Sequence, residues 1–237
     1  MFQYYDKIVK GTDREDMLVI HQTLAGMIGE KFSFLNYYKE IPVSYDATLL
    51  SIENEMAEFA VHEYQAKVIS FERKALIQSH PKFPFSEDIV GEAFYVNSTK
   101  KRSILCKFAY ARIRSQMRKF VRVLLDCPVE ADLIFEGDVL KGNVKDLSLG
   151  GAAINVMSSD LLVPGQEIKL SLRLPDLNSN KVNQVAMTAT VLNVIGECAP
   201  FTCIIEFHTE KLSQQQISYY INQRQVEIIK ELKESNA

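Results

Sequence analysis

The chain has 237 residues, 47% of them hydrophobic and 24% charged, and its formal net charge at pH 7 is −3. This composition is typical of a globular protein that is large enough for two small domains. No apolar run approaches the 18 residues of a membrane span and no cleavable leader is recognisable, so we expect a cytoplasmic protein.

The four cysteines form no C-x-x-C pair and the four histidines are scattered along the chain. This pattern gives no support to a disulfide framework or to a zinc site, and we expect no metal and no cofactor. Each cysteine is interpreted as a small buried or half-buried apolar residue.

The first predicted element is a helix that starts near Asp13, because Thr12 and Glu15 have the spacing of a capping box. Apolar residues then recur at helical spacing, and Gly29 is the predicted stop. The apolar stripe, which we expect to pack on the adjacent domain, consists of Met17, Ile20, Leu24, Met27 and Ile28.

From about Lys31 to Tyr110 the sequence consists of short runs rich in β-branched and aromatic residues, which predict strands of a small β-barrel or sandwich. A turn is predicted at His80–Pro84, and no clustered reactive site is apparent. The predicted strands are Ile41–Leu50, Met56–Val61, Lys67–Ile77, Ile89–Val96 and Ile104–Ala109.

The stretch from Lys100 to Arg122 contains nine basic residues and no acidic residue. Without these nine the chain has 18 basic and 30 acidic residues, a net charge of −12. This asymmetry indicates an anionic partner, whereas the plain alternative is a solvated linker or helix face.

A second β series follows, and it predicts a closed barrel of about six strands, which would leave no exposed sheet edge. The pair Gly150 and Gly151 is expected to allow positive φ and a close approach of the backbone. The predicted strands are Val129–Phe135, Val139–Asp146, Ala152–Val156, Ile168–Leu174, Val185–Val191 and Phe201–Phe207.

A last helix is predicted from Ser213 to Glu234, with an apolar side that is interrupted around Arg224 and Gln225. We expect its first turns to pack on the barrel and its remaining half to form a subunit contact, since an exposed apolar stripe is unfavourable. The apolar positions are Ile217, Tyr220, Ile221, Ile228, Ile229 and Leu232.

Two motifs precede and enter the second β series. Arg118 and Arg122 form R-x-x-x-R, and Asp146, Ser148 and Gly151 form D-x-S-x-x-G. Each motif alone is weak, because arginines four apart are common on helix surfaces and Asp or Ser often closes a turn. Together, in this order and ahead of a six-strand pattern with a terminal helix, they resemble the PilZ family of bacterial cyclic di-GMP receptors. The resemblance covers about residues 114–230.

The resemblance implies a mainly β protein with two small barrels, an N-terminal helix and a C-terminal helix. Residues 1–111 would form the N-terminal helix with a split-barrel-like domain. Residues 112–237 would form the PilZ domain, including the basic connector and the C-terminal helix. By position and strand content, the first half is similar to the barrel that precedes PilZ in the flagellar-brake proteins.

The resemblance also implies a role for each motif residue. Arg118 and Arg122 would pair with the phosphates or guanines of cyclic di-GMP, because a guanidinium can bind either bidentately and stack on a base. Asp146 would accept hydrogen bonds from a guanine edge, and Ser148 would add a hydroxyl contact. Gly151 would lack a Cβ where the ligand or its own turn comes close.

The residue before Arg118 is Met117, so no third guanidinium is expected there, and the number of ligands per site stays open. Arg112, Arg114 and Lys119 either steer the anion or are plain solvated charges. The expected protein is a non-catalytic cyclic di-GMP effector in which ligand binding reorients two domains. Its expected output is motility, through a protein partner such as the flagellar motor, with biofilm or virulence control next; we also expect a homodimer.

Three alternatives belong to other classes. A PilZ-like adaptor would bind proteins without cyclic di-GMP, and an oligonucleotide-binding barrel would use the basic stretch. The acidic remainder of the chain argues against a long nucleic-acid polymer. An enzyme has the least support, since neither a Gly-rich phosphate loop nor a nucleophile with its base is recognisable.

Overall fold

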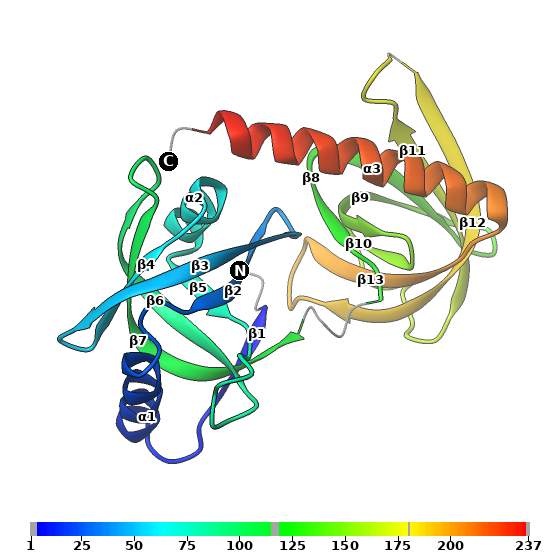
Figure 1. Cartoon of the computed structure of the whole chain (residues 1–237). Helices are drawn as coiled ribbons and strands as arrows, with labels where there is room; N and C mark the ends of the chain where they lie inside the picture. The colour runs from blue at the N-terminus through cyan, green and yellow to red at the C-terminus, as the bar shows by residue number, and fades with distance from the viewer. Residues whose placement is uncertain (1–3, 115–118, 180, 236–237) are drawn as a thin grey trace. The chain divides into compact units, whose positions relative to one another are not determined.

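The computed structural model describes residues 4–114, 119–179 and 181–235 (Figure 1). The fold is mainly β, as predicted, and the chain divides into two compact units. The first unit comprises Met1–Tyr38, Pro42–Arg118 and Lys230–Ala237, and the second comprises Lys39–Ile41 and Lys119–Ile229. None of the helices in the described ranges is both long and apolar enough to cross a membrane.

The first unit contains a seven-stranded sheet in the order β1-β7-β4-β3-β2-β5-β6. Because β6 also pairs with β7, six of these strands close into a ring, and β1 is added outside it. This arrangement is the barrel predicted for the N-terminal half. The strands are β1 (Tyr5–Ile8), β2 (Lys31–Tyr38), β3 (Ile41–Glu53), β4 (Met56–Ala60), β5 (Lys74–Ile77), β6 (Asp88–Asn97) and β7 (Arg102–Ile113).

The first helix, α1 (Asp13–Ala25), begins where the sequence predicted it. The Glu15 N–H donates to the Thr12 hydroxyl at 3.2 Å, and the Thr12 N–H donates to the Glu15 carboxylate at 2.9 Å. The helix ends earlier than predicted, with Gly26 as its cap and Gly29 beyond it at φ +90°. Ile20 and Leu24 are completely buried in the core of the first unit, whereas Ile28 is exposed.

The predicted strand Lys67–Ile77 is wrong. Its first part belongs to the helix α2 (Glu63–Glu72), and only its last four residues form a strand. The His62 ring caps the helix by accepting a hydrogen bond from the Tyr64 N–H, and Arg73 ends it in the left-handed conformation at φ 59°. A His N-cap and an Arg C-cap are not the usual helix signals, so a run rich in β-branched residues was misread.

The second unit is a closed barrel in the order β10-β13-β12-β11-β8-β9, which confirms the six-stranded prediction. The largest difference in strand bounds is at β8, which begins at Arg122, well before the predicted Val129, because Leu125–Pro128 leave the ladder and interrupt the alternation. The strands are β8 (Arg122–Ile134), β9 (Val139–Ser148), β10 (Gly151–Val156), β11 (Glu167–Pro175), β12 (Val182–Ile195) and β13 (Phe201–His208).

The last helix, α3 (Lys211–Glu234), confirms the predicted C-terminal helix, but its apolar side is not interrupted as expected. Arg224 lies in the buried row with 5% of its surface exposed, and Ile228 and Leu232 are buried as well. Of the predicted apolar positions in the second half, Ile228 and Leu232 are therefore not available for a subunit contact. Ile229 is an exception, because it is 43% exposed.

Candidate ligand-binding site

The basic stretch does not act as one set of free charges. Arg114 donates to Asp6 through two guanidinium nitrogens, and this pairing lowers the pKa of the Asp6 carboxyl below its ordinary value. Lys107 pairs with Glu92 at 2.9 Å. Within the described chain, carboxylates of the first unit thus neutralise part of the charge that the sequence concentrates, which weakens the argument for an extended polyanion partner.

The motif residues occupy neighbouring positions on one face of the second barrel. Arg122 pairs with Ser148 across β8 and β9, and Ser148 pairs with Gly151 across β9 and β10. Gly151 in turn pairs with Glu206 on β13. We call these four residues, Arg122, Ser148, Gly151 and Glu206, the outer row.

A second row on the same face lies two residues further along each strand than the outer row. Asp146 pairs with Leu124 on β8 and with Ala153 on β10, and Ala153 pairs with Ile204 on β13. We call Leu124, Asp146, Ala153 and Ile204 the neighbouring row. The two rows bring Arg122, Asp146, Ser148 and Gly151 together, although the first and the last are 29 positions apart in the sequence.

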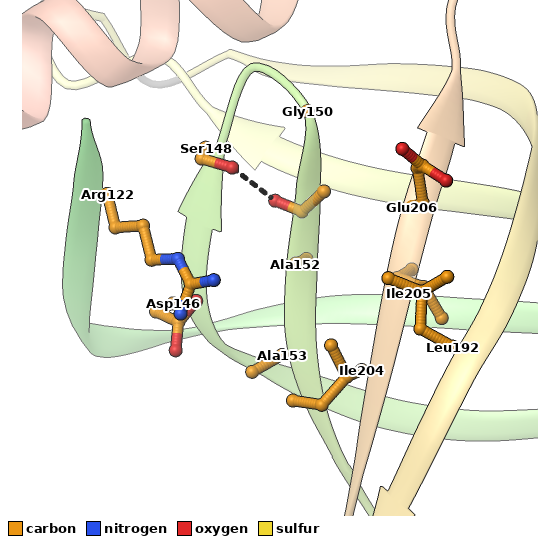
Figure 2. Close-up of a pocket in the computed structure, with 11 residues that line it drawn as sticks. Arg122, Asp146, Ser148, Gly150, Ala152, Ala153, Leu192, Ile204, Ile205 and Glu206 are labelled. Carbon is orange, nitrogen blue, oxygen red and sulfur yellow. Dashed lines mark hydrogen bonds between the residues drawn. The ribbon is translucent and has the colours of Figure 1, made fainter. Parts of the chain in front are cut away.

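A β-bulge at Lys145 sets which way these side chains point. Val144 and Leu147 are both buried in the barrel, and two residues lie between them where regular alternation allows one. The extra residue therefore keeps Asp146 and Ser148 on the outer face, on the same side as Arg122. Figure 2 shows the Arg122 side chain extending from β8 toward Asp146.

The two glycines after this strand meet one of the two predictions made for them, the close approach of the backbone, and not the other. Neither is among the residues with positive φ, so that expectation is wrong for both. A Cβ on Gly151 would lie 2.2 Å from the carbonyl oxygen of Ile205, so its close approach is to the β13 backbone. A Cβ on Gly150 would lie 2.9 Å from the Phe120 ring.

Ser148 takes part in its own turn. Its hydroxyl donates to the Gly151 carbonyl at 3.1 Å, as the dashed line in Figure 2 shows. Its oxygen retains lone pairs that can accept a hydrogen bond from a ligand. The turn-closing role and a ligand contact are therefore compatible for this residue.

A pocket of about 120 Å³ lies over these residues. It is smaller than the pockets that enclose drug-sized ligands, so it would receive part of a dinucleotide. Its lining includes residues that belong to neither motif. Two of these, Ile204 and Glu206, lie on the last predicted strand, and its alternation together with the strand order would have placed them on the outer face. The additional lining residues are Gly150, Ala152, Ala153, Leu192, Ile204, Ile205 and Glu206.

Arg118, the other predicted arginine, lies outside the described residues, as does Met117. In the described ranges no group of three or more His, Cys, Asp or Glu side chains is arranged to hold a metal ion. The cysteines are free, and Cys127 and Cys198 are exposed, so the expectation that each would be at least half-buried is wrong for these two.

Comparison with known proteins gives a family for the second half of the chain. Residues 116–223 match the family described as the PilZ domain, and these residues include all five motif positions. No curated protein matches the chain.

The solved structures to which this chain is similar share little sequence with it. The inhibitor of motility MotI (DgrA) of Bacillus subtilis is 16% identical over 84% of this chain and 97% of its own, with a TM-score of 0.44. YcgR of Escherichia coli, solved with c-di-GMP, is 10% identical over 97% and 96%, with a TM-score of 0.44. MrkH of K. pneumonia, also solved with c-di-GMP, is 15% identical over 96% and 99%, with a TM-score of 0.43. The comparisons thus place a match to the PilZ domain at residues 116–223 of this chain.

Proposed function

We propose that this protein is a cytoplasmic, non-catalytic receptor for cyclic di-GMP. The observation that carries the proposal is the convergence of Arg122, Asp146, Ser148 and Gly151 on one outer face of the PilZ barrel, where they line a common pocket. Conversion of the ligand would require further reactive groups, whereas binding requires only the charges and hydrogen-bonding groups that these residues carry.

The residue types match the chemistry of the ligand. Arg122 supplies a guanidinium for a phosphate or for the O6 and N7 edge of a guanine, and it can stack on the base. Asp146 supplies an acceptor for the N–H groups of a guanine, and the lone pairs of Ser148 supply another. Arg118 is proposed as the second guanidinium of the site.

Isothermal titration of the full chain with cyclic di-GMP tests this function, with GTP and cyclic di-AMP as comparison ligands. We expect saturable binding of cyclic di-GMP that is about 30- to 150-fold weaker in Arg122→Ala, because a charge-assisted partner contributes about 2 to 3 kcal/mol. We expect the same loss in Arg118→Ala.

Arg173→Ala is the matched control for this titration. Arg173 is an arginine of β11 in the same barrel that pairs with Glu130 and Asp132, away from the pocket residues. Its variant should bind like the wild type. If the folded wild-type protein does not bind cyclic di-GMP, the receptor function is rejected and the alternative of a protein-binding adaptor is favoured. The same titration gives the number of ligands per chain.

The proposed output is a change in the relative orientation of the two domains that controls motility, biofilm formation or virulence through a protein partner such as the flagellar motor. Such a switch requires the ligand to bind one arrangement more tightly than another. Energy transfer between a fluorescent label in each unit should change on ligand addition in the wild type and not in Arg122→Ala.

We propose separately that the protein is a homodimer. Light scattering that shows a monomer at all concentrations would reject this proposal.

A further inference from the structure

The outer row continues past the PilZ motifs to a carboxylate that no motif includes. Glu206 pairs with Gly151 on one side and with Thr190 of β12 on the other, and it lines the same pocket. We propose that Glu206 determines base specificity by accepting hydrogen bonds from the Watson–Crick edge of a guanine of the ligand. This inference rests on the proposed function and assigns a further residue to that site.

Gly151 makes a groove between the two ends of the outer row. Because Gly151 has no side chain, the β10 backbone forms the floor of this groove. Ser148 forms one wall and Glu206 the other (Figure 2). Neighbouring strands lie about 4.8 Å apart, so the walls are about 10 Å apart at the backbone. In the neighbouring row, Ala153 and Ile204 add an apolar surface to the same pocket.

The charges of the outer row have opposite sign at its two ends. Arg122 supplies a cation on β8, and Glu206 supplies an anion on β13, three strands away along the row. The phosphates of a dinucleotide are attracted to the first end and repelled by the second. The Glu206 end therefore favours an uncharged hydrogen-bond donor of the ligand, and of these the guanine edge has two donors side by side, whereas each ribose has a single hydroxyl.

A carboxylate distinguishes guanine from adenine at this edge. Guanine presents N1–H and the N2 amino group side by side, and the two carboxylate oxygens can accept from both. Adenine presents the lone pair of N1 at the corresponding position, which a carboxylate oxygen repels. A site built to accept hydrogen bonds discriminates strongly against an analogue that lacks the donors, because its own polar group is left unpaired.

The test is titration of the full chain and of Glu206→Ala with cyclic di-GMP and with its inosine analogue, cyclic di-IMP, which lacks the N2 amino groups. We expect Glu206→Ala to bind cyclic di-GMP about 10- to 100-fold more weakly than the wild type, the range of hydrogen bonds to a charged group. We also expect the preference for cyclic di-GMP over cyclic di-IMP to shrink in the variant. Glu206→Gln, which keeps the shape and removes the charge, should change both quantities in the same direction.

Glu167→Ala is the matched control. Glu167 pairs with Thr190 from the other side, so it lies in the same line of residues but two strands beyond Glu206 and does not line the pocket. The Glu167→Ala substitution removes the same charge from the barrel surface and should leave the affinities for cyclic di-GMP and for cyclic di-IMP unchanged. Thermal unfolding of each variant verifies that the barrel is folded.

The outcomes separate this proposal from the function on which it rests. A wild type that does not bind cyclic di-GMP rejects the receptor function itself. If the wild type binds and the Glu206 variants bind equally or more tightly, the receptor function stands and the assignment of Glu206 is wrong, because the carboxylate then only repels phosphate. Equal weakening in the Glu167 and Glu206 variants would also overturn the assignment.

Discussion

Gly151 is the residue of the site at which the packing of two strands leaves the least room for a side chain. A Cβ would lie 2.2 Å from the Ile205 carbonyl oxygen, and that oxygen belongs to the β13 backbone and cannot rotate away. The glycine of the D-x-S-x-x-G motif is thus required by the pairing of β10 with β13, before any ligand is considered. The resulting flat floor is then available to the ligand.

We therefore predict that Gly151→Ala lowers the free energy of unfolding by about 1 to 3 kcal/mol, the range for overpacked sites. Chemical denaturation without ligand measures this loss. Gly150→Ala is the matched neighbour, because its Cβ would meet the ring of Phe120, a side chain that can move, and it should cost less. Equal costs for the two variants would contradict this explanation.

Single residues of the site were predictable from the sequence only where a motif marked them. The motif spacing brought Arg122, Asp146 and Ser148 into one proposal, and the structure places them on one face. Glu206 was not predicted, because the pairing of β13 with β10 joins strands that are distant in sequence. The outward orientation of Asp146 also depends on the bulge at Lys145, and the regular alternation of side chains along a strand does not predict a bulge.

At the scale of elements, α3 is tied to β8 by one buried side chain. The Arg224 guanidinium donates to the Leu124 carbonyl at 3.3 Å and to the carboxylates of Asp126 and Glu227. Leu124 and Asp126 flank the point at which β8 leaves its ladder, two and four residues after Arg122. Arg224 thus stabilises the segment that follows the ligand-binding arginine.

We predict that Arg224→Met destabilises the second unit by about 1 to 3 kcal/mol. Breaking a fully buried pair costs more, but the Asp126 and Glu227 side chains are 40% and 46% exposed and can be solvated after the change. Urea denaturation followed by circular dichroism measures the effect. Arg173→Met is the control: that arginine is 41% exposed, so its loss should cost less than about 1 kcal/mol. A larger loss for Arg173→Met would refute the argument from burial.

Elements whose ends carry ordinary signals were predictable, and those with unusual ends were not. The capping box placed the start of α1, and strict alternation placed β11. The α2 helix was missed because its caps are His62 and Arg73, and the apolar residues between them are partly β-branched. Arg224 was read as an interruption of α3 because a buried arginine is recognisable only through its partners.

At the scale of the whole molecule, two buried groups couple stability to alkaline pH. Burial raises the pKa of the Cys203 thiol from 9.0 to about 11 and that of the Tyr220 phenol from 10.0 to about 12. Both groups keep their protons in the folded protein at pH values at which the unfolded chain releases them. Their contribution to stability is therefore complete below pH 9 and is lost as the pH rises toward 11 and 12.

We predict that the midpoint of urea denaturation falls between pH 9 and pH 11 in the wild type. The fall should be shallower in Cys203→Ala, although cavity formation lowers its stability at every pH. Tyr220→Phe should flatten the curve above pH 10. If neither variant changes the slope, other groups cause the alkaline loss.

The outer row also has a consequence for the order in which the protein is made. Its residues extend from position 122 to position 206, and β13, which carries the last of them, is the final strand of the barrel. A nascent chain that ends before Phe201 lacks one wall of the groove and the strand that joins β10 to β12. The ligand would therefore stabilise only chains whose barrel has been synthesised completely, and it would not assist the early steps of folding on the ribosome.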